Sequence, residues 1–76
     1  MKSITEILQG IRPEFDFSTS EDFFEDGMLD SFDLMVLVSE LESTYGIHLD
    51  GIEIVPGSFR NIEAIRALLA RHGVQA

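Results

Sequence analysis

Residues 31–45, SFDLMVLVSELESTY, carry the strongest helical pattern in the sequence. On a helix that turns about 100° per residue, one set of apolar side chains falls within roughly 80° of arc. This set consists of Leu34, Leu37, Val38, Leu41 and Tyr45. The pattern predicts a helix that packs one side against a core and ends at Gly46, since glycine commonly terminates helices.

The opposite side of this helix is also apolar, because Phe32, Met35 and Val36 gather there. A small domain has little capacity to bury a helix on every side, so the second patch favours a docking surface beside Ser31. The alternative is that Phe32 or Met35 packs beneath the segment that precedes the helix.

Two further helices are predicted. Residues 3–12 combine helical apolar spacing with a capping box of Ser3 and Glu6, and the following proline should stop the helix. Residues 61–72 begin at Asn61 as the cap and end before a glycine. The core positions expected in these two helices are Ile4, Ile7, Leu8, Ile11, Ile62, Ile65, Leu68 and Leu69.

The connecting segments lack a sustained helical period. Residues 13–30 contain four phenylalanines, which predicts a long loop held to the core by some of those rings. Residues 47–57 predict a short connection with one helical turn near 51–55, ended by Pro56 and Gly57. The expected fold is therefore an all-α bundle of three main helices plus one short helix.

Composition limits how this domain is stabilised. The 76 residues, expected to form a single domain over 1–76, contain no cysteine, so disulfides and thiolate zinc sites are excluded. Hydrophobic residues make up 45% of the chain, which is enough for a core. No apolar run approaches the roughly 20 residues that span a bilayer. The N-terminus has no signal-peptide pattern, so a cytoplasmic location is expected.

The sequence is strongly acidic, with 14 acids, five bases and a formal net charge of −9. Twelve of the acids run from Glu14 to Glu53, and no base lies between Arg12 and Arg60. Such a surface repels nucleic acid and anionic membranes and attracts basic protein partners. The alternative is a solvated face that serves solubility alone.

Ser31 follows Asp30 at the predicted start of the central helix, where a serine is most often a helix cap. A nucleophilic serine needs a general base and a group that orients this base. The imidazoles of the chain belong to His48 and His72, and neither lies in a recognisable triad pattern. The pattern of serine and histidine residues therefore does not favour a catalytic function for this chain.

Two longer stretches resemble a known family. Residues 27–49, GMLDSFDLMVLVSELESTYGIHL, are similar to the attachment-site helix of acyl carrier and peptidyl carrier proteins. Residues 56–69, PGSFRNIEAIRALL, resemble the path into the last helix of that family. An Asp-Ser-Leu-like motif opens the second helix of these proteins, and here it reads Asp30-Ser31-Phe32. The resemblance implies a small acyl-carrier-like four-helix bundle with a long loop between its first and second helices.

The resemblance also implies a function. Ser31 would bear a covalent 4'-phosphopantetheine arm from coenzyme A, and Asp30 would help to hold the transferase and its metal near the serine. Gly27 would allow the turn before the site. The chain would be a freestanding, non-catalytic monomer that shuttles acyl or aminoacyl thioesters. The positions expected to bind partners are Phe32, Asp33, Met35, Val36, Glu40 and Glu42.

The partners implied are a phosphopantetheinyl transferase, an acyl- or aminoacyl-activating ligase and downstream acyl-transfer enzymes with basic docking surfaces. Many fatty-acid carriers place a glutamate where Val36 stands, which favours a specialised pathway over housekeeping fatty-acid synthesis. Because Asp30 and Asp33 flank the helix start, we expect them to repel the phosphodiester and let the arm swing outward.

Two alternatives concern other classes of site. A calcium loop that starts at Asp16 requires glycine at Glu21 and a bidentate glutamate at Gly27, so no dedicated metal site is expected. A carrier-like interaction module with an unmodified Ser31 is the second alternative, and the sequence leaves it open.

Overall fold

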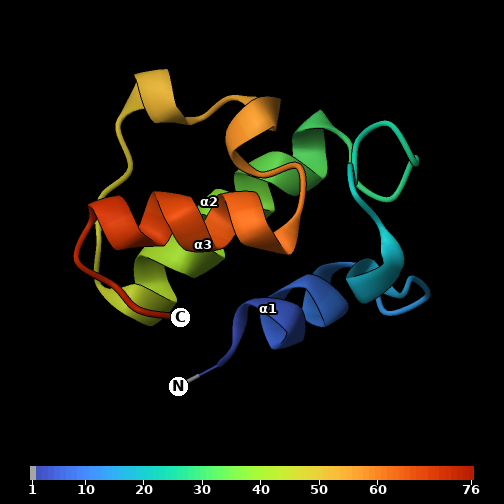
Figure 1. The fold of residues 1–76 in the computed structure, drawn as a ribbon, viewed down its shortest axis with the longest axis horizontal. Coiled ribbons are helices and arrows are strands. Elements are labelled where there is room, and N and C mark those ends of the chain that lie inside the picture. The colour runs from blue at the N-terminus through green and yellow to red at the C-terminus, as the bar shows by residue number, and fades with distance from the viewer. Residues whose placement is uncertain (1) are drawn as a thin grey trace.

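The computed structural model describes residues 2–76, which form three α-helices joined by segments with short 3-10 turns (Figure 1). The elements in chain order are α1 (Ile4–Ile11), η1 (Phe17–Thr19), α2 (Ser31–Tyr45), η2 (Gly51–Glu53), η3 (Pro56–Ser58) and α3 (Ile62–Arg71). No strand occurs within residues 2–76, so the predicted all-α fold is confirmed. None of the helices in this range has the length and apolar character needed to cross a membrane.

The predicted helix bounds agree closely with the structure. The bounds of α2 are those expected, and Gly46 follows in the left-handed conformation with a φ of 66°. Both α1 and α3 lie one residue inside the predicted range at each end. The turn expected after Asp50 is η2, but Pro56 and Gly57 begin a second turn rather than ending the first. Proline suits this position because its fixed φ is compatible with the first residue of a helical turn.

Side-chain caps begin α1 and α3. In α1, the backbone N–H of Glu6 donates to Ser3 Oγ at 3.2 Å, and the N–H of Ser3 donates to Glu6 Oε1 at 3.1 Å. This reciprocal pair is the predicted capping box. In α3, the N–H of Ala64 donates to Asn61 Oδ1 at 2.7 Å. Because Asn61 Nδ2 also donates to the carbonyl of Glu21 at 2.9 Å, the cap ties α3 to the long loop.

The first helix packs against both α2 and α3. The Tyr45 hydroxyl donates to the carbonyl of Lys2 at 2.9 Å, which places the beginning of α1 beside the end of α2. At the other end of α1, Arg12 contacts Asp33 in the first turn of α2. The two helices are therefore antiparallel, and the end of α1 reaches the residues around Ser31.

Aromatic side chains hold the long loop before α2. Phe17 and Phe23 are fully buried and meet edge to face, with their ring centroids 5.0 Å apart. Phe15 and Phe24 are half-buried against the same core. The expected anchoring by some of the four rings is confirmed. Near the end of the loop, Gly27 has a φ of 72°, a left-handed conformation that glycine adopts without strain.

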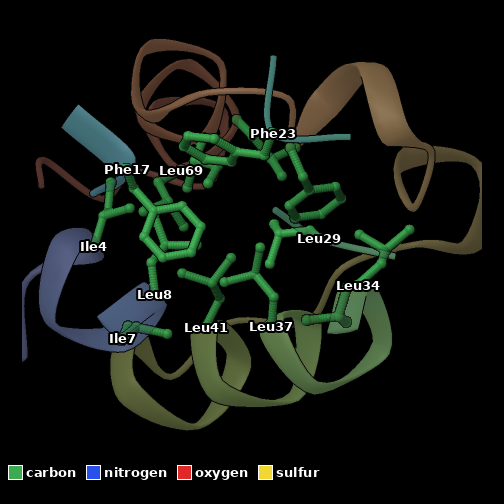
Figure 2. Close-up of a cluster of buried hydrophobic side chains, with 14 of the residues drawn as sticks. Ile4, Ile7, Leu8, Phe17, Phe23, Leu29, Leu34, Leu37, Leu41 and Leu69 are labelled. Carbon is green, nitrogen blue, oxygen red and sulfur yellow. The ribbon is translucent and has the colours of Figure 1, made fainter. Parts of the chain in front are cut away.

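One hydrophobic core joins the helices and the loops (Figure 2). It includes Leu29, Leu49 and Phe59 from segments between the helices, which helical periodicity did not predict. Three residues predicted for the core are half-buried at its edge, and they are Ile11, Tyr45 and Ile62. The buried members are Ile4, Ile7, Leu8, Phe17, Phe23, Leu29, Leu34, Leu37, Val38, Leu41, Leu49, Phe59, Ile65, Leu68 and Leu69.

Replacing Phe23 with alanine should lower the free energy of unfolding by about 3–5 kcal/mol, because it removes a fully buried ring and leaves a cavity. That loss is a large part of the roughly 5–15 kcal/mol that stabilises a typical domain. Phe24→Ala, at a half-buried position on the same loop, is the matched control and should cost clearly less. Urea unfolding followed by circular dichroism measures both variants, and equal losses would contradict the anchoring role of Phe23.

Candidate functional site

Ser31 is the first residue of α2 and is exposed to solvent. The cap of this helix is Asp30, whose extended backbone lets Oδ1 accept the N–H of Asp33 at 2.9 Å. Asp33 Oδ2 accepts the N–H of Asp30 in return, at 3.2 Å. The expectation that Ser31 itself is the cap is wrong by one residue. The capping bonds are made by the two aspartates on either side of the serine.

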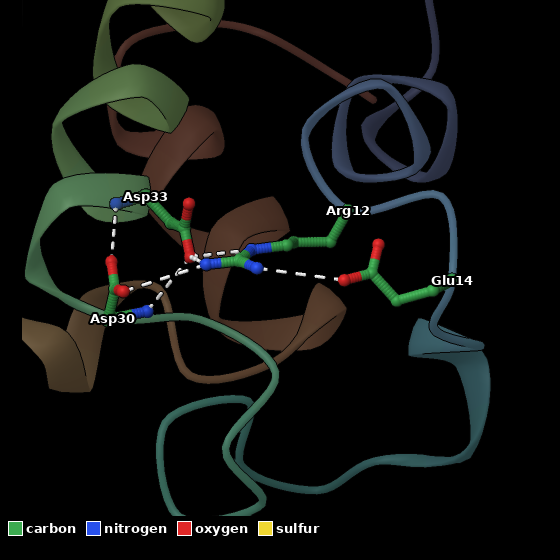
Figure 3. A network of polar contacts seen from close by, with 4 residues as sticks. All are labelled: Arg12, Glu14, Asp30 and Asp33. Atoms are coloured by element: carbon green, nitrogen blue, oxygen red, sulfur yellow. Dashed lines mark hydrogen bonds and ion pairs between the residues drawn. The ribbon is translucent and has the colours of Figure 1, made fainter.

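Asp33 carries a buried carboxylate, since only 5% of the residue is exposed. A buried charge is costly unless an opposite charge and hydrogen bonds compensate it. Arg12, at the end of α1, supplies both, because its Nε and Nη2 lie 3.0 Å and 2.9 Å from Asp33 Oδ2 (Figure 3). The same oxygen accepts the N–H of Asp30, so one atom links α1 to the cap of α2.

Two longer contacts extend this network. Arg12 Nη2 lies 3.6 Å from Asp30 Oδ2, and Nη1 lies 3.6 Å from Glu14 Oε2. Figure 3 shows the guanidinium between these carboxylates. The hydrogen bond to Asp33 raises the pKa of Arg12. The backbone N–H of Asp33 lowers the pKa of Asp30, and the charge of Arg12 adds to this effect.

The burial of Asp33 corrects two expectations. Its side chain does not lie on the surface, so it is not available for contact with a partner protein. Its charge is paired with Arg12, so the exposed carboxylate of Asp30 is the one left to repel an anion at Ser31. The sequence held a signal for this arrangement, because an acid three residues after an aspartate at a helix start is a capping-box pattern.

Two of the residues expected to face partners are strongly exposed. Phe32 is 76% exposed and Met35 is 57% exposed. The alternative that one of them packs beneath the preceding loop is therefore wrong for both residues. Large apolar side chains at this exposure form a surface that begins next to Ser31 and continues along the first turns of α2.

The other residues expected to face partners are less accessible. Val36 and Glu40 are half-buried and line a groove of about 320 Å³ between α1 and α2. Glu42 is half-buried too, and its Oε2 accepts the N–H of Leu49 at 2.8 Å and lies 3.4 Å from His48 Nδ1. Glu42 therefore fastens the segment that follows α2.

Two exposed apolar residues in the connection between α2 and α3 were not predicted. Ile52 in η2 is 88% exposed, and Val55 just before η3 is 45% exposed. No pattern in the sequence predicts them, because this connection has no helical period that would assign a side chain to one face. Exposed apolar side chains are therefore not confined to α2.

The fold, with an exposed serine at the first turn of α2 and exposed apolar side chains beside it, is that of a carrier-type helical domain. The comparison with family models identifies the particular family: the chain belongs to the phosphopantetheine attachment site family, whose model matches residues 2–71. Members of this family are carrier domains and not enzymes. Comparisons with curated proteins and with solved structures gave no match.

The lowered pKa of Asp30 makes the helix cap sensitive to acid. A carboxyl whose pKa is lowered by folding stabilises the fold above its ordinary pKa of about 3.9, and this contribution is lost as the pH falls through the folded-state pKa. Asparagine also caps helices but does not titrate. The difference in melting temperature between wild type and Asp30→Asn should therefore shrink between about pH 6 and about pH 2.5.

The control for this comparison is Glu25→Gln, which removes an exposed acid outside the cap. Its melting temperature should follow that of the wild type across the same pH range. Parallel curves for wild type and Asp30→Asn would show that the charge of Asp30 adds nothing to the cap.

Proposed function

We propose that the chain is a freestanding acyl carrier protein and that Ser31 bears the 4'-phosphopantetheine arm. The observation that carries this proposal is the exposed Ser31 at the first turn of α2, in a chain of the attachment-site family. When bound, the arm supplies a flexible thiol that holds an acyl or aminoacyl group as a thioester. The protein then carries this group between separate enzymes.

The surroundings of Ser31 fit a bound phosphodiester. The serine lies at the N-terminus of α2, where free backbone N–H groups and the positive end of the helix dipole favour an anion. One of the two neighbouring carboxylates, that of Asp33, is paired with Arg12, which reduces repulsion. Both Ser31 and Phe32 are exposed, so an arm has room to extend into solvent.

Attachment is a single phosphoryl transfer from coenzyme A. Ser31 Oγ attacks the phosphorus atom that carries the pantetheine, and the Oγ–P bond forms as the bond from that phosphorus to the bridging oxygen breaks. Adenosine 3',5'-bisphosphate leaves with the electron pair, and the hydroxyl proton passes to a base of the transferase. In this scheme Asp30, which is exposed beside the serine, contacts the transferase and its magnesium ion.

The proposed partner surface consists of Phe32 and Met35, with Val36 and Glu40 at its edge. Exposed apolar side chains on an acidic protein suit enzymes that surround an apolar pocket with basic residues. The partners are the transferase, an acyl- or aminoacyl-activating ligase and later acyl-transfer enzymes, in the cytoplasm. Because Val36 stands where many fatty-acid carriers place a glutamate, we favour a specialised pathway.

Incubation with coenzyme A, magnesium and a broad-specificity phosphopantetheinyl transferase should add one arm, seen by intact mass. Ser31→Ala should abolish the addition and leave the free energy of unfolding within about 0.5 kcal/mol, because the serine is exposed and does not cap the helix. Ser39→Ala, at another exposed serine of α2, is the control and should still be labelled. A wild-type protein that stays unlabelled would instead support an interaction module without an arm.

Replacing Met35 with alanine should raise the KM of a loading ligase for the holo protein by roughly fivefold or more, as expected when a central apolar contact is lost. Its folding should change by less than about 0.5 kcal/mol, because Met35 is mostly exposed. Val38→Ala, at a buried position of the same helix, should show the reverse, with lower stability and an unchanged KM. Equal KM values for wild type and Met35→Ala would remove this residue from the docking surface.

A further inference from the structure

We propose that Arg12 is a positioning residue for the transfer to Ser31. Through Asp33, its guanidinium fixes the first turn of α2 and thereby the place of the serine hydroxyl. This inference rests on the proposed attachment at Ser31. It goes beyond that proposal by assigning a role in the attachment reaction to a residue 19 positions earlier in the sequence, directly after α1.

The first step of the argument is that Arg12 is itself held in place. It is the C-terminal cap that directly follows α1, and its backbone N–H donates to the carbonyl of Leu8 at 3.0 Å. Leu8 is fully buried in the core. The guanidinium therefore extends from the fixed end of α1. It can hold the first turn of α2 in place relative to α1.

The second step is that the contacts of Arg12 converge on the residues that flank the serine. Nε and Nη2 both lie within 3.0 Å of Asp33 Oδ2, and this atom also accepts the N–H of Asp30. The N–H of Asp33 bonds back to Asp30 Oδ1. Ser31 stands between the two members of this reciprocal pair, so the backbone is fixed on both sides of it.

The third step is electrostatic. Without Arg12, the buried carboxylate of Asp33 would lose its positively charged partner. It would keep the hydrogen bond from the N–H of Asp30. A buried carboxylate without a charged partner is costly, so Asp33 would turn toward water, and this movement would loosen the capping pair. Arg12 also offsets the negative charge of Asp30 beside the site, where the anionic diphosphate of coenzyme A must approach.

The test is the steady-state kinetics of labelling by purified transferase, at a temperature at which circular dichroism shows every variant folded. For Arg12→Gln, we expect kcat to fall by roughly 10–100-fold, the range associated with a misplaced reacting group. The KM for the carrier should stay within about twofold, because the exposed apolar surface of α2 is untouched. Arg60→Gln removes one exposed cation elsewhere and should match the wild type.

Three further measurements separate positioning from a purely structural role. Arg12→Lys keeps the charge but not the two converging donors, so its kcat should lie between those of wild type and Arg12→Gln. The double variant Arg12→Gln/Asp33→Asn removes the buried charge that destabilises the single variant. Its kcat for labelling should nevertheless stay well below that of the wild type. The amide of Leu34, which donates to the carbonyl of Asp30 at 2.9 Å, should exchange faster in Arg12→Gln than in Arg60→Gln.

The outcomes are distinguishable. A wild-type protein that takes no label overturns the proposed function, and this inference with it. A labelled wild type beside an Arg12→Gln protein with the same kcat overturns this inference alone. Full recovery of kcat in the double variant does so too, because it would show that Arg12 serves stability and not position.

Discussion

The buried carboxylate of Asp33 is the constraint on which the arrangement of the site depends. A charge at 5% exposure is tolerated here because Arg12 and the backbone of Asp30 compensate it. For this to happen, Arg12 must follow the end of α1 at a place from which its side chain reaches Asp33, and Asp30 must cap the first turn of α2. This ion pair joins the end of α1 to the first turn of α2, beside the serine, while the buried side chains of both helices form the rest of their contact.

The rest of the domain relies on apolar packing, to which the segments between the α-helices also contribute, although with fewer buried side chains than the helices. A chain of 76 residues without cysteine has neither a disulfide nor a thiolate metal site to restrain its longest loop. Phe17 and Phe23 perform that task by stacking edge to face inside the core, and Phe59 inserts from the segment before α3. The backbone of Phe23 also donates to the carbonyl of Arg60 at 2.6 Å. The loop that leads to the serine is consequently an ordered part of the fold.

The features that the sequence allowed us to predict are local ones. Helix bounds follow from apolar spacing and from caps such as Asn61, which act within one turn. The predicted cap of α2 is one residue late because Asp30 and Ser31 are both good capping residues, and the choice depends on the acid at the third helical position, Asp33. The pairing of that acid with Arg12 spans 21 residues and depends on how α1 packs, so no local pattern reports it. The same holds for which rings of the loop are buried.

The two sides of α2 share a backbone but not their side-chain contacts. Leu34, Leu37 and Leu41 are buried, while Phe32 and Met35 lie in water on the other side. Substitutions at well-separated, independent positions usually have additive effects. Selection can therefore alter the exposed pair without disturbing the interior. A helix of this kind can acquire new partner enzymes through a few surface substitutions while the buried residues preserve its thermodynamic stability. Exchange of such surfaces between related chains offers an engineering route to redirect a carrier, provided that the ion pair beneath the serine is left intact.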